Sequence, residues 1–294
     1  MKIIITGANG LLGQKIVRQC IKNKIDFLAT SQGENRNSNC QNNNYHSLDI
    51  TSKNQIDAVV RLYNPTHIIN TAAITNVDYC ENHVEECQHV NVSAVELLFD
   101  VCKKNQIHFT QLSTDFVFDG EDGPYEENDI VNPLSVYAKS KVDSETILKT
   151  SPYANWVIVR TIIVYGEGEN LSRSNIVLWA KGALLEGKSL TIVDDQFSAP
   201  TWADDLAWAC LKITKLKATG VYHISGPILY SIYELVCKIA DFYECDKSLV
   251  QAIKSNTLNQ KAKRPPKTGF ILTKSKKVLG YEPKNLEDTL KLIQ

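Results

Sequence analysis

Tyr137 and Lys141 stand four residues apart in the segment 133–141, PLSVYAKSK. If this segment is helical, the spacing places both side chains on one face of the helix. A lysine ammonium beside a phenol stabilises the phenolate, which lowers the pKa of the phenol from about 10 toward neutrality. Tyr137 is therefore predicted to exchange a proton at neutral pH. Such pairs also occur on solvated helix faces, so the prediction depends on the elements that surround this one.

A glycine-rich turn at residues 7–13, GANGLLG, follows an apolar run at residues 2–6. The next apolar residues recur at helical spacing, so the turn connects a strand to a helix. Gly7 permits the tight turn, Gly10 lets the backbone approach a pyrophosphate, and Gly13 lets the helix pack closely on the strand. The helix N-terminus favours phosphate charge. The expected cofactor contacts here are Gly7, Asn9, Gly10, Leu11, Leu12 and Gly13.

The second expected strand, residues 26–30, ends at Ser31 without an acidic residue. An NAD site usually carries Asp or Glu at this position to bind the ribose hydroxyls. Its absence removes the repulsion that a 2′-phosphate would meet, and Arg36 is available as a cation, which favours NADPH over NADH. Alternatively, Arg36 is only part of an Asn-rich loop at 35–44 that we expect to be flexible and solvated.

Strands and helices alternate from residue 2 to about 160, which predicts a doubly wound, parallel α/β (Rossmann) sheet. Ligands bind at the carboxyl ends of the strands in such sheets. The glycine turn, the small residues Ala72 and Ala73, and Ser113-Thr114 all fall at that edge. We expect residues 1–166 and about 201–226 to form the dinucleotide-binding domain. Residues of about 167–200 and 227–294 are expected to form a smaller α/β substrate lobe, with 167–173 as a mobile loop over the cleft.

The composition is that of an ordinary globular protein, with a formal net charge of −1 and 43% hydrophobic residues. No basic excess points to nucleic acid or to a membrane surface. The eight cysteines are scattered, without a Cys-x-x-Cys pair, so reduced structural thiols are expected and no metal site is predicted. No signal peptide or long apolar run is evident, and we expect a cytoplasmic protein.

The chain resembles the dTDP-4-dehydrorhamnose reductases, a family within the extended short-chain dehydrogenase/reductase superfamily. The string at 113–120, STDFVFDG, is the most family-specific part of the resemblance. The resemblance also extends over the glycine turn, Asn70 to Ala73, residues 77–81, Asn91, the Tyr137/Lys141 pair, residues 159–166, Asp195-Gln196, residues 199–201, residues 205–207 and Arg264-Pro265.

This resemblance implies that Thr114, Tyr137 and Lys141 are the catalytic residues. NAD(P)H would reduce the C4 ketone of a nucleotide-linked deoxyhexose, Tyr137 would protonate the oxygen, Thr114 would hydrogen-bond it, and Lys141 would bind the nicotinamide ribose. Further cofactor contacts would come from Ser31, Asp49, Ile50, Ala72 and Ala73. The sugar nucleotide would contact Asp115, Phe116, Gln196, Thr201 and Arg264. The resemblance also suggests a homodimer.

Two features limit what the resemblance implies. Family members usually have Trp where this chain has Ile163, which leaves a different sugar or stereochemical outcome open. A 4,6-dehydratase is disfavoured because Phe116 replaces the Glu that would move a proton. A nucleotide-sugar epimerase, and a non-catalytic subunit like the regulatory subunit of methionine adenosyltransferase, stay open as alternatives.

Overall fold

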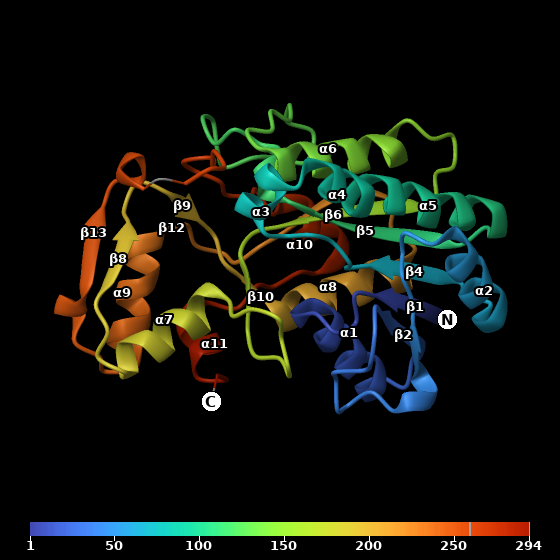
Figure 1. The fold of residues 1–294 in the computed structure, drawn as a ribbon, viewed down its shortest axis with the longest axis horizontal. Coiled ribbons are helices and arrows are strands. Elements are labelled where there is room, and N and C mark those ends of the chain that lie inside the picture. The colour runs from blue at the N-terminus through green and yellow to red at the C-terminus, as the bar shows by residue number, and fades with distance from the viewer. Residues whose placement is uncertain (259, 294) are drawn as a thin grey trace.

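The computed structural model describes residues 1–258 and 260–293. Its centre is a sheet of seven strands in the order β11-β6-β5-β4-β1-β2-β3 (Figure 1). All neighbouring pairs in this sheet are parallel. The strands are β1 (Lys2–Thr6), β2 (Asp26–Ser31), β3 (Tyr45–Ser47), β4 (His67–Asn70), β5 (His108–Thr114), β6 (Trp156–Thr161) and β11 (Gly220–Ile224). The predicted doubly wound parallel sheet is confirmed.

Helices cover both faces of the sheet. One face carries α1 (Leu11–Lys22), α8 (Ala203–Leu216) and α10 (Thr273–Leu279), and the other carries α2 (Lys53–Tyr63), α5 (Ala94–Asn105) and α6 (Val136–Lys149). Side chains alternate across a strand, so Ile3 and Ile5 of β1 pack with α1 and α8, while Ile4 packs with α2 and α5. Burial on both faces explains why β1 is apolar throughout.

Some helices around the sheet are short or divided. The side chain of Ser52 caps α2 by accepting from Gln55 N, whereas Thr51 donates to Asp49. The helical segment 84–105 is divided into α4 (Val84–Gln88), a π-helical turn at His89–Ser93 and α5. Helix α3 (Val77–Asn82), capped by Asn76, was not predicted because six residues are too few for a helical periodicity.

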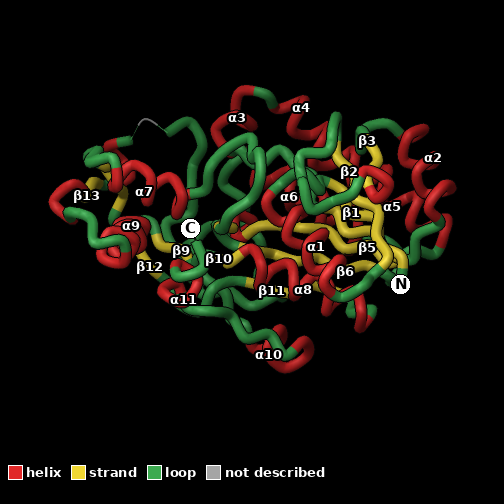
Figure 2. Tube along the Cα trace, turned by 90° about the horizontal axis from the view of Figure 1, so that it is seen from below, coloured by secondary structure: helices red, strands yellow, loops and turns green. Residues whose placement is uncertain are grey.

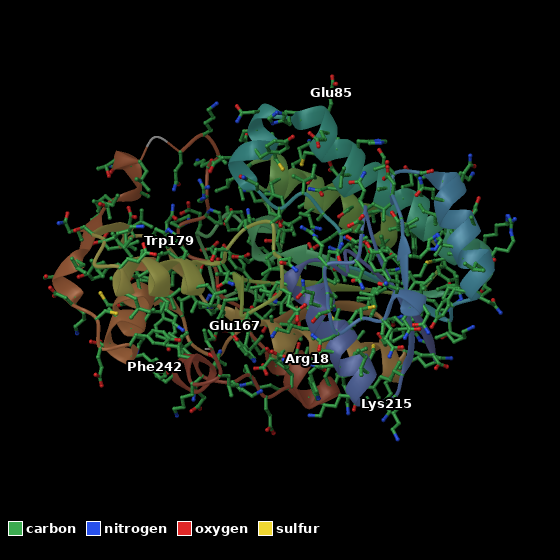
Figure 3. All side chains as sticks on the ribbon, turned by 60° about the horizontal axis from the view of Figure 1, so that its bottom comes forward. Arg18, Glu85, Glu167, Trp179, Lys215 and Phe242 are labelled. Carbon is green, nitrogen blue, oxygen red and sulfur yellow. The ribbon has the colours of Figure 1, made fainter. Side chains whose placement is uncertain are left out.

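The second lobe has its own core. It contains α7 (Ile176–Leu185), β8 (Leu190–Val193), β9 (Phe197–Ser198), β12 (Tyr230–Ser231), α9 (Ile232–Phe242), β13 (Val250–Ile253) and α11 (Leu286–Leu290). Strand β13 pairs with β8 and β12 pairs with β9. These elements gather at one end of the molecule, where Trp179 of α7 is labelled in Figure 3. Strands β7 (Val164–Tyr165) and β10 (Thr201–Trp202) pair at the junction of the two lobes.

One stretch of the expected second lobe returns to the main sheet. Phe270, Leu272, Leu279 and Tyr281 belong to the core that α1 and α8 share, and Figure 2 shows α10 apart from α9 and β13. The division of the chain into two lobes stays a proposal, and this packing favours assigning residues 270–281 to the dinucleotide-binding part.

Candidate active site

The glycine turn is packed too closely for side chains. Gly7 has a φ of +67°, and a Cβ there would lie 2.7 Å from Ala72 N. A Cβ on Gly13 would lie 2.4 Å from the carbonyl oxygen of Gly7. Helix α1 therefore begins directly over the end of β1, with Gly10 at its N-cap. Its first N–H groups and its positive dipole end suit a pyrophosphate, so the residues present fit a dinucleotide.

A cleft of about 460 Å³ opens beside this turn at the carboxyl edge of the sheet. Eleven of the predicted site residues line it: Asn9, Gly10, Leu11, Leu12, Gly13, Ala73, Thr114, Asp115, Phe116, Tyr137 and Lys141. It is also lined by Thr71, Thr75, Val77, Leu112, Ser113, Thr161, Ile163, Val164 and residues 171–175. The glycine turn and the proposed catalytic residues thus share one cavity.

Tyr137 lies in the first turn of α6, next to Thr114 at the end of β5. The side chain of Ser135 caps this helix by accepting from Ala138 N. Tyr137 is 9% exposed, and its phenol lies near enough to the Thr114 hydroxyl for that hydroxyl to affect its pKa. Burial raises the pKa of Tyr137 well above 10, although the Thr114 hydrogen bond opposes this rise. The predicted fall in the pKa of Tyr137 was wrong for this arrangement, because the raised pKa keeps the phenol neutral at pH 7.

Burial is the main cause of that difference, and the direction of the Lys141 side chain is consistent with it. Its ammonium donates to the Leu112 carbonyl oxygen on β5 at 2.7 Å, so it is not directed at the phenol. Burial lowers the pKa of Lys141 to about 8, against the opposing effect of Glu145. Lys141 is therefore mostly charged at pH 7 and carries its charge into the cleft.

Helix α6 is anchored by buried polar contacts. Glu145 accepts from Arg160 of β6 at 2.7 and 2.9 Å and from Ser113 Oγ at 2.6 Å. Asn91, in the π-helical turn, donates to Ser140 Oγ at 3.1 Å and binds both the N–H and the carbonyl of Ile74. These contacts fix the position of α6 relative to β5, and hence the position of Tyr137 relative to Thr114.

Asp115 and Phe116 follow Thr114 directly. Asp115 is 2% exposed, and its carboxyl group is hydrogen-bonded to Thr114 Oγ1 and Thr268 Oγ1. Burial raises the pKa of Asp115 to about 6, although both hydroxyls act to lower it. The ring of Phe116 meets that of Tyr137 edge to face at 6.2 Å. Phe116 thus supplies an apolar wall beside the phenol.

Eight predicted site residues lie outside the cleft lining: Gly7, Ser31, Asp49, Ile50, Ala72, Gln196, Thr201 and Arg264. Ser31 is the last residue of β2 and Asp49 follows β3 at the same edge of the sheet, where the Asp49 carboxylate accepts from Thr51 N. Thr201 is fully buried and donates to the Ile162 carbonyl oxygen, and its contact with the substrate stays a prediction. Thr201 belongs to the short strand β10, which pairs with β7.

Arg264 is also used elsewhere. Its guanidinium pairs with Asp78 of α3 at 2.6 Å and at 3.4 Å. The pair joins residues 261–267 (KAKRPPK), the Pro-Lys-rich segment, to α3 of the first lobe. Arg264 is not among the residues that line the cleft. Gln196 is half-buried, and its carbonyl oxygen accepts from Ile232 N at the start of α9.

Residues 167–173, which we call the strap, cross over the glycine turn. Glu169 exchanges hydrogen bonds with the Gln14 side chain at 2.7 and 2.8 Å. Its carboxylate accepts from the N–H and the hydroxyl of Ser38, both at 2.7 Å. The loop at 35–44, expected to be solvated, is thus held in place, and Asn37 within it is buried. These links were missed because they join polar residues far apart in sequence.

Ile163 lines the cleft with a φ of +32°, a left-handed conformation that is rare for a β-branched residue. Such strain often accompanies functional sites. Ile163 lies just after the end of β6. Its carbonyl oxygen accepts from Thr201 N at 3.1 Å. The position where family members usually carry Trp is therefore part of this cavity.

Two other classes of site are absent from the described part of the chain. No group of three His, Cys, Asp or Glu side chains there could hold a metal ion. No helix among residues 1–258 and 260–293 is long and apolar enough to cross a membrane.

Comparison with known proteins identifies relatives over the whole chain. The family model of the RmlD substrate binding domain matches residues 1–293. A dTDP-4-dehydrorhamnose reductase of Aggregatibacter actinomycetemcomitans is 32% identical, over 100% of this chain and 98% of the relative. A crystal structure of a dTDP-4-dehydrorhamnose reductase of Bacillus anthracis in complex with NADP superposes with a TM-score of 0.85 at 25% identity, covering 99% and 98% of the two chains. Methionine adenosyltransferase 2 subunit beta of Xenopus laevis is 30% identical over 86% of this chain and 75% of the relative.

Proposed function

The chain belongs to the RmlD substrate binding domain family, and on that premise we propose that it reduces the 4-keto group of a nucleotide-linked 6-deoxyhexose with NADPH. The nucleotide sugar is that of the dTDP-4-dehydrorhamnose reductases to which the chain is similar. The observation that supports this most is the meeting of Thr114, Tyr137 and Lys141 in the cleft that the glycine turn lines. An intact proton donor beside a dinucleotide cradle is what a ketone reductase needs.

The chain's own residues divide the work as follows. The glycine turn and Ala73 would hold the dinucleotide, which supplies a hydride for C4 when bound. Tyr137 is neutral and gives its phenolic proton to the carbonyl oxygen. Thr114 hydrogen-bonds the same oxygen, and the Lys141 ammonium, which carries its charge into the cleft, would bind the nicotinamide ribose. The apolar ring of Phe116 and the side chain of Ile163 would face the sugar.

The relationship to methionine adenosyltransferase 2 subunit beta keeps a second candidate function, a regulatory subunit without catalysis. The complete Thr114/Tyr137/Lys141 set favours an enzyme, because a purely regulatory subunit has no use for a proton donor in the cleft. An epimerase would use the same tyrosine but would return its hydride to the substrate.

Location and assembly belong to the same proposal. All eight cysteines are free thiols, which supports a reducing compartment such as the cytoplasm. A homodimer is suggested by the family resemblance alone, and sedimentation would test it.

The direct test is loss of NADPH absorbance on addition of dTDP-4-dehydrorhamnose. We expect stoichiometric NADPH oxidation, and Tyr137→Phe should lower kcat by a factor of about 100 or more while NADPH still binds. Full turnover by Tyr137→Phe would contradict the role of Tyr137. Tightly bound NAD with no net oxidation would instead indicate the epimerase. A co-purifying partner in fixed ratio, without turnover, would indicate the regulatory subunit.

A further inference from the structure

Asp115 connects Thr114 to a residue of the second lobe. Its Oδ1 lies 3.0 Å from Thr114 Oγ1, and its Oδ2 lies 2.5 Å from Thr268 Oγ1. All three side chains are buried, and Thr268 is 1% exposed. Neither the resemblance nor the cleft lining assigns a role to Thr268, so its short contact behind the Asp115 carboxyl group requires an explanation.

The constraint comes from the single hydrogen of the Thr114 hydroxyl. Thr114 Oγ1 accepts from Phe116 N at 3.2 Å and donates its hydrogen to Asp115 Oδ1. While that hydrogen points at Asp115, Thr114 has none to donate to a ketone oxygen. For Thr114 to act on the substrate, Asp115 must release this hydrogen.

An ionised Asp115 cannot release it, because a carboxylate only accepts hydrogen bonds and would also repel the developing alkoxide. A neutral Asp115 can donate from Oδ1 to Thr114 Oγ1, which turns the Thr114 hydrogen toward the cleft. Burial favours the neutral form by raising the pKa of Asp115 to about 6. The titratable groups around this cluster are Tyr137 of α6, Cys80 of α3 and Arg173 of the strap.

The neutral acid must also carry its hydrogen on the correct oxygen. A hydrogen on Oδ2 would leave Oδ1 as an acceptor, and Thr114 would again donate to Asp115. Because Thr268 donates to Oδ2, it favours placing the carboxyl hydrogen on Oδ1. Thr268 is in turn fixed by the second lobe, since its N–H donates to the Phe197 carbonyl of β9 at 3.0 Å.

We propose that Thr268 is a positioning residue that acts through Asp115 to turn the Thr114 hydroxyl toward the substrate. Because Thr268 is held by β9 of the second lobe, the position of that lobe then affects the direction of the Thr114 hydroxyl hydrogen. This inference rests on the proposed reductase function, because it assumes that Thr114 donates to a ketone oxygen.

The test compares Thr268→Val, which removes the hydroxyl at constant shape, with Thr268→Ser, which keeps it. At saturating NADPH, wild-type kcat/KM for dTDP-4-dehydrorhamnose should fall as the pH rises through the pKa of Asp115, which is about 6. The Thr268 hydrogen bond lowers the pKa of Asp115, so Thr268→Val should move this inflection to higher pH. It should also lower the acid plateau of kcat about tenfold with little change in KM. Thr268→Ser should restore both.

Asp115→Asn identifies the inflection. Its amide would accept from Thr268 and donate to Thr114, as the neutral acid does, so the inflection near 6 should vanish. The inflection expected from Lys141 near 8 should stay. If Thr268→Val lowers kcat without moving the inflection, or if Thr268→Ser behaves like Thr268→Val, Thr268 is merely structural and the proposal fails. The same holds if Asp115→Asn keeps the wild-type inflection or is inactive at every pH.

A failure of the proposed function is recognised separately. If the wild-type protein does not oxidise NADPH at any pH, the reductase assignment is wrong. Carbon-13 NMR titration of the Asp115 carboxyl group in wild type and Thr268→Val then still measures the effect of the Thr268 hydroxyl on the pKa of Asp115. An unchanged pKa of Asp115 in Thr268→Val would overturn the proposed coupling between the two residues, and a raised pKa would support it.

Discussion

At the scale of residues, burial rather than charge determines how the site is prepared. Tyr137, Asp115 and Lys141 are each buried. Burial raises the pKa of Tyr137 and of Asp115 and lowers that of Lys141, which favours the neutral form of all three. Residue types and spacing predicted that the glycine turn and Ser113-Thr114 share one edge of the sheet, and the family resemblance added Thr114 to the Tyr137/Lys141 pair. Neither could predict the sign of the Tyr137 pKa shift, because that sign is set by the burial of the phenol in the folded protein.

The raised pKa of Asp115 predicts a pH-dependent stability. The folded pKa, about 6, exceeds the ordinary value of about 3.8. The free energy of unfolding therefore carries the full contribution of the neutral Asp115 carboxyl group below about pH 4, and it loses this contribution as the pH rises through about 6. Asp115→Asn cannot ionise, so it should be more stable than wild type at pH 8 by up to about 3 kcal/mol and equally stable near pH 4. Urea unfolding at both pH values measures this, and a constant difference would contradict it.

At the scale of elements, the glycine turn makes the sharpest demand. Gly13→Ala would place a methyl group against the Gly7 carbonyl oxygen, so α1 would have to move away from β1. We expect this variant to lose NADPH binding by titration calorimetry and to be destabilised. Gly182→Ala is the matched control, because a Cβ at this position in α7 meets nothing within 4 Å. It should bind NADPH normally and gain about 0.5–1 kcal/mol. Normal NADPH binding by Gly13→Ala would contradict the proposal that the glycine turn holds the dinucleotide.

The same scale shows where sequence reasoning succeeds. Strand β1 and helix α1, on the two sides of the glycine turn, were predicted from their apolar patterns. Helix α3 and the short strands β7, β9, β10 and β12 were missed because their pairing is decided by distant partners, such as Val164 with Thr201. Thr201 was predicted as a site residue from the family resemblance alone, and in the structure it lies in one of these short strands, β10.

At the scale of the whole molecule, the site depends on contacts between segments far apart in the chain. Asp78 and Arg264 are 186 residues apart and form an ion pair between α3 and the Pro-Lys-rich segment. The hydrogen bond from Arg264 lowers the pKa of Asp78, so the pair stays charged at neutral pH. Thr268 follows four residues later, so this pair helps to hold the second lobe at the catalytic site. No local pattern could have predicted either partner.

This ion pair distinguishes two roles for Arg264. If Arg264 acts as a contact between lobes, Asp78→Asn and Arg264→Met should each raise KM for the nucleotide sugar by a similar factor, about three to ten. The double variant should then be no worse than either single variant, because both remove one interaction. NADPH affinity should be unchanged in all three. If Arg264 binds the substrate diphosphate, Arg264→Met should be far more damaging than Asp78→Asn, and the contact role would be refuted.

The central claim is that hydride reaches C4 of the sugar in the cleft where Tyr137 donates its proton. Transfer of deuterium from labelled NADPH, followed by NMR of the sugar product, tests this most directly. We expect one deuterium at C4 per NADPH oxidised by the wild-type protein, and almost none with Tyr137→Phe under the same saturation by NADPH. A product without deuterium at C4, or equal transfer by Tyr137→Phe, would contradict the account.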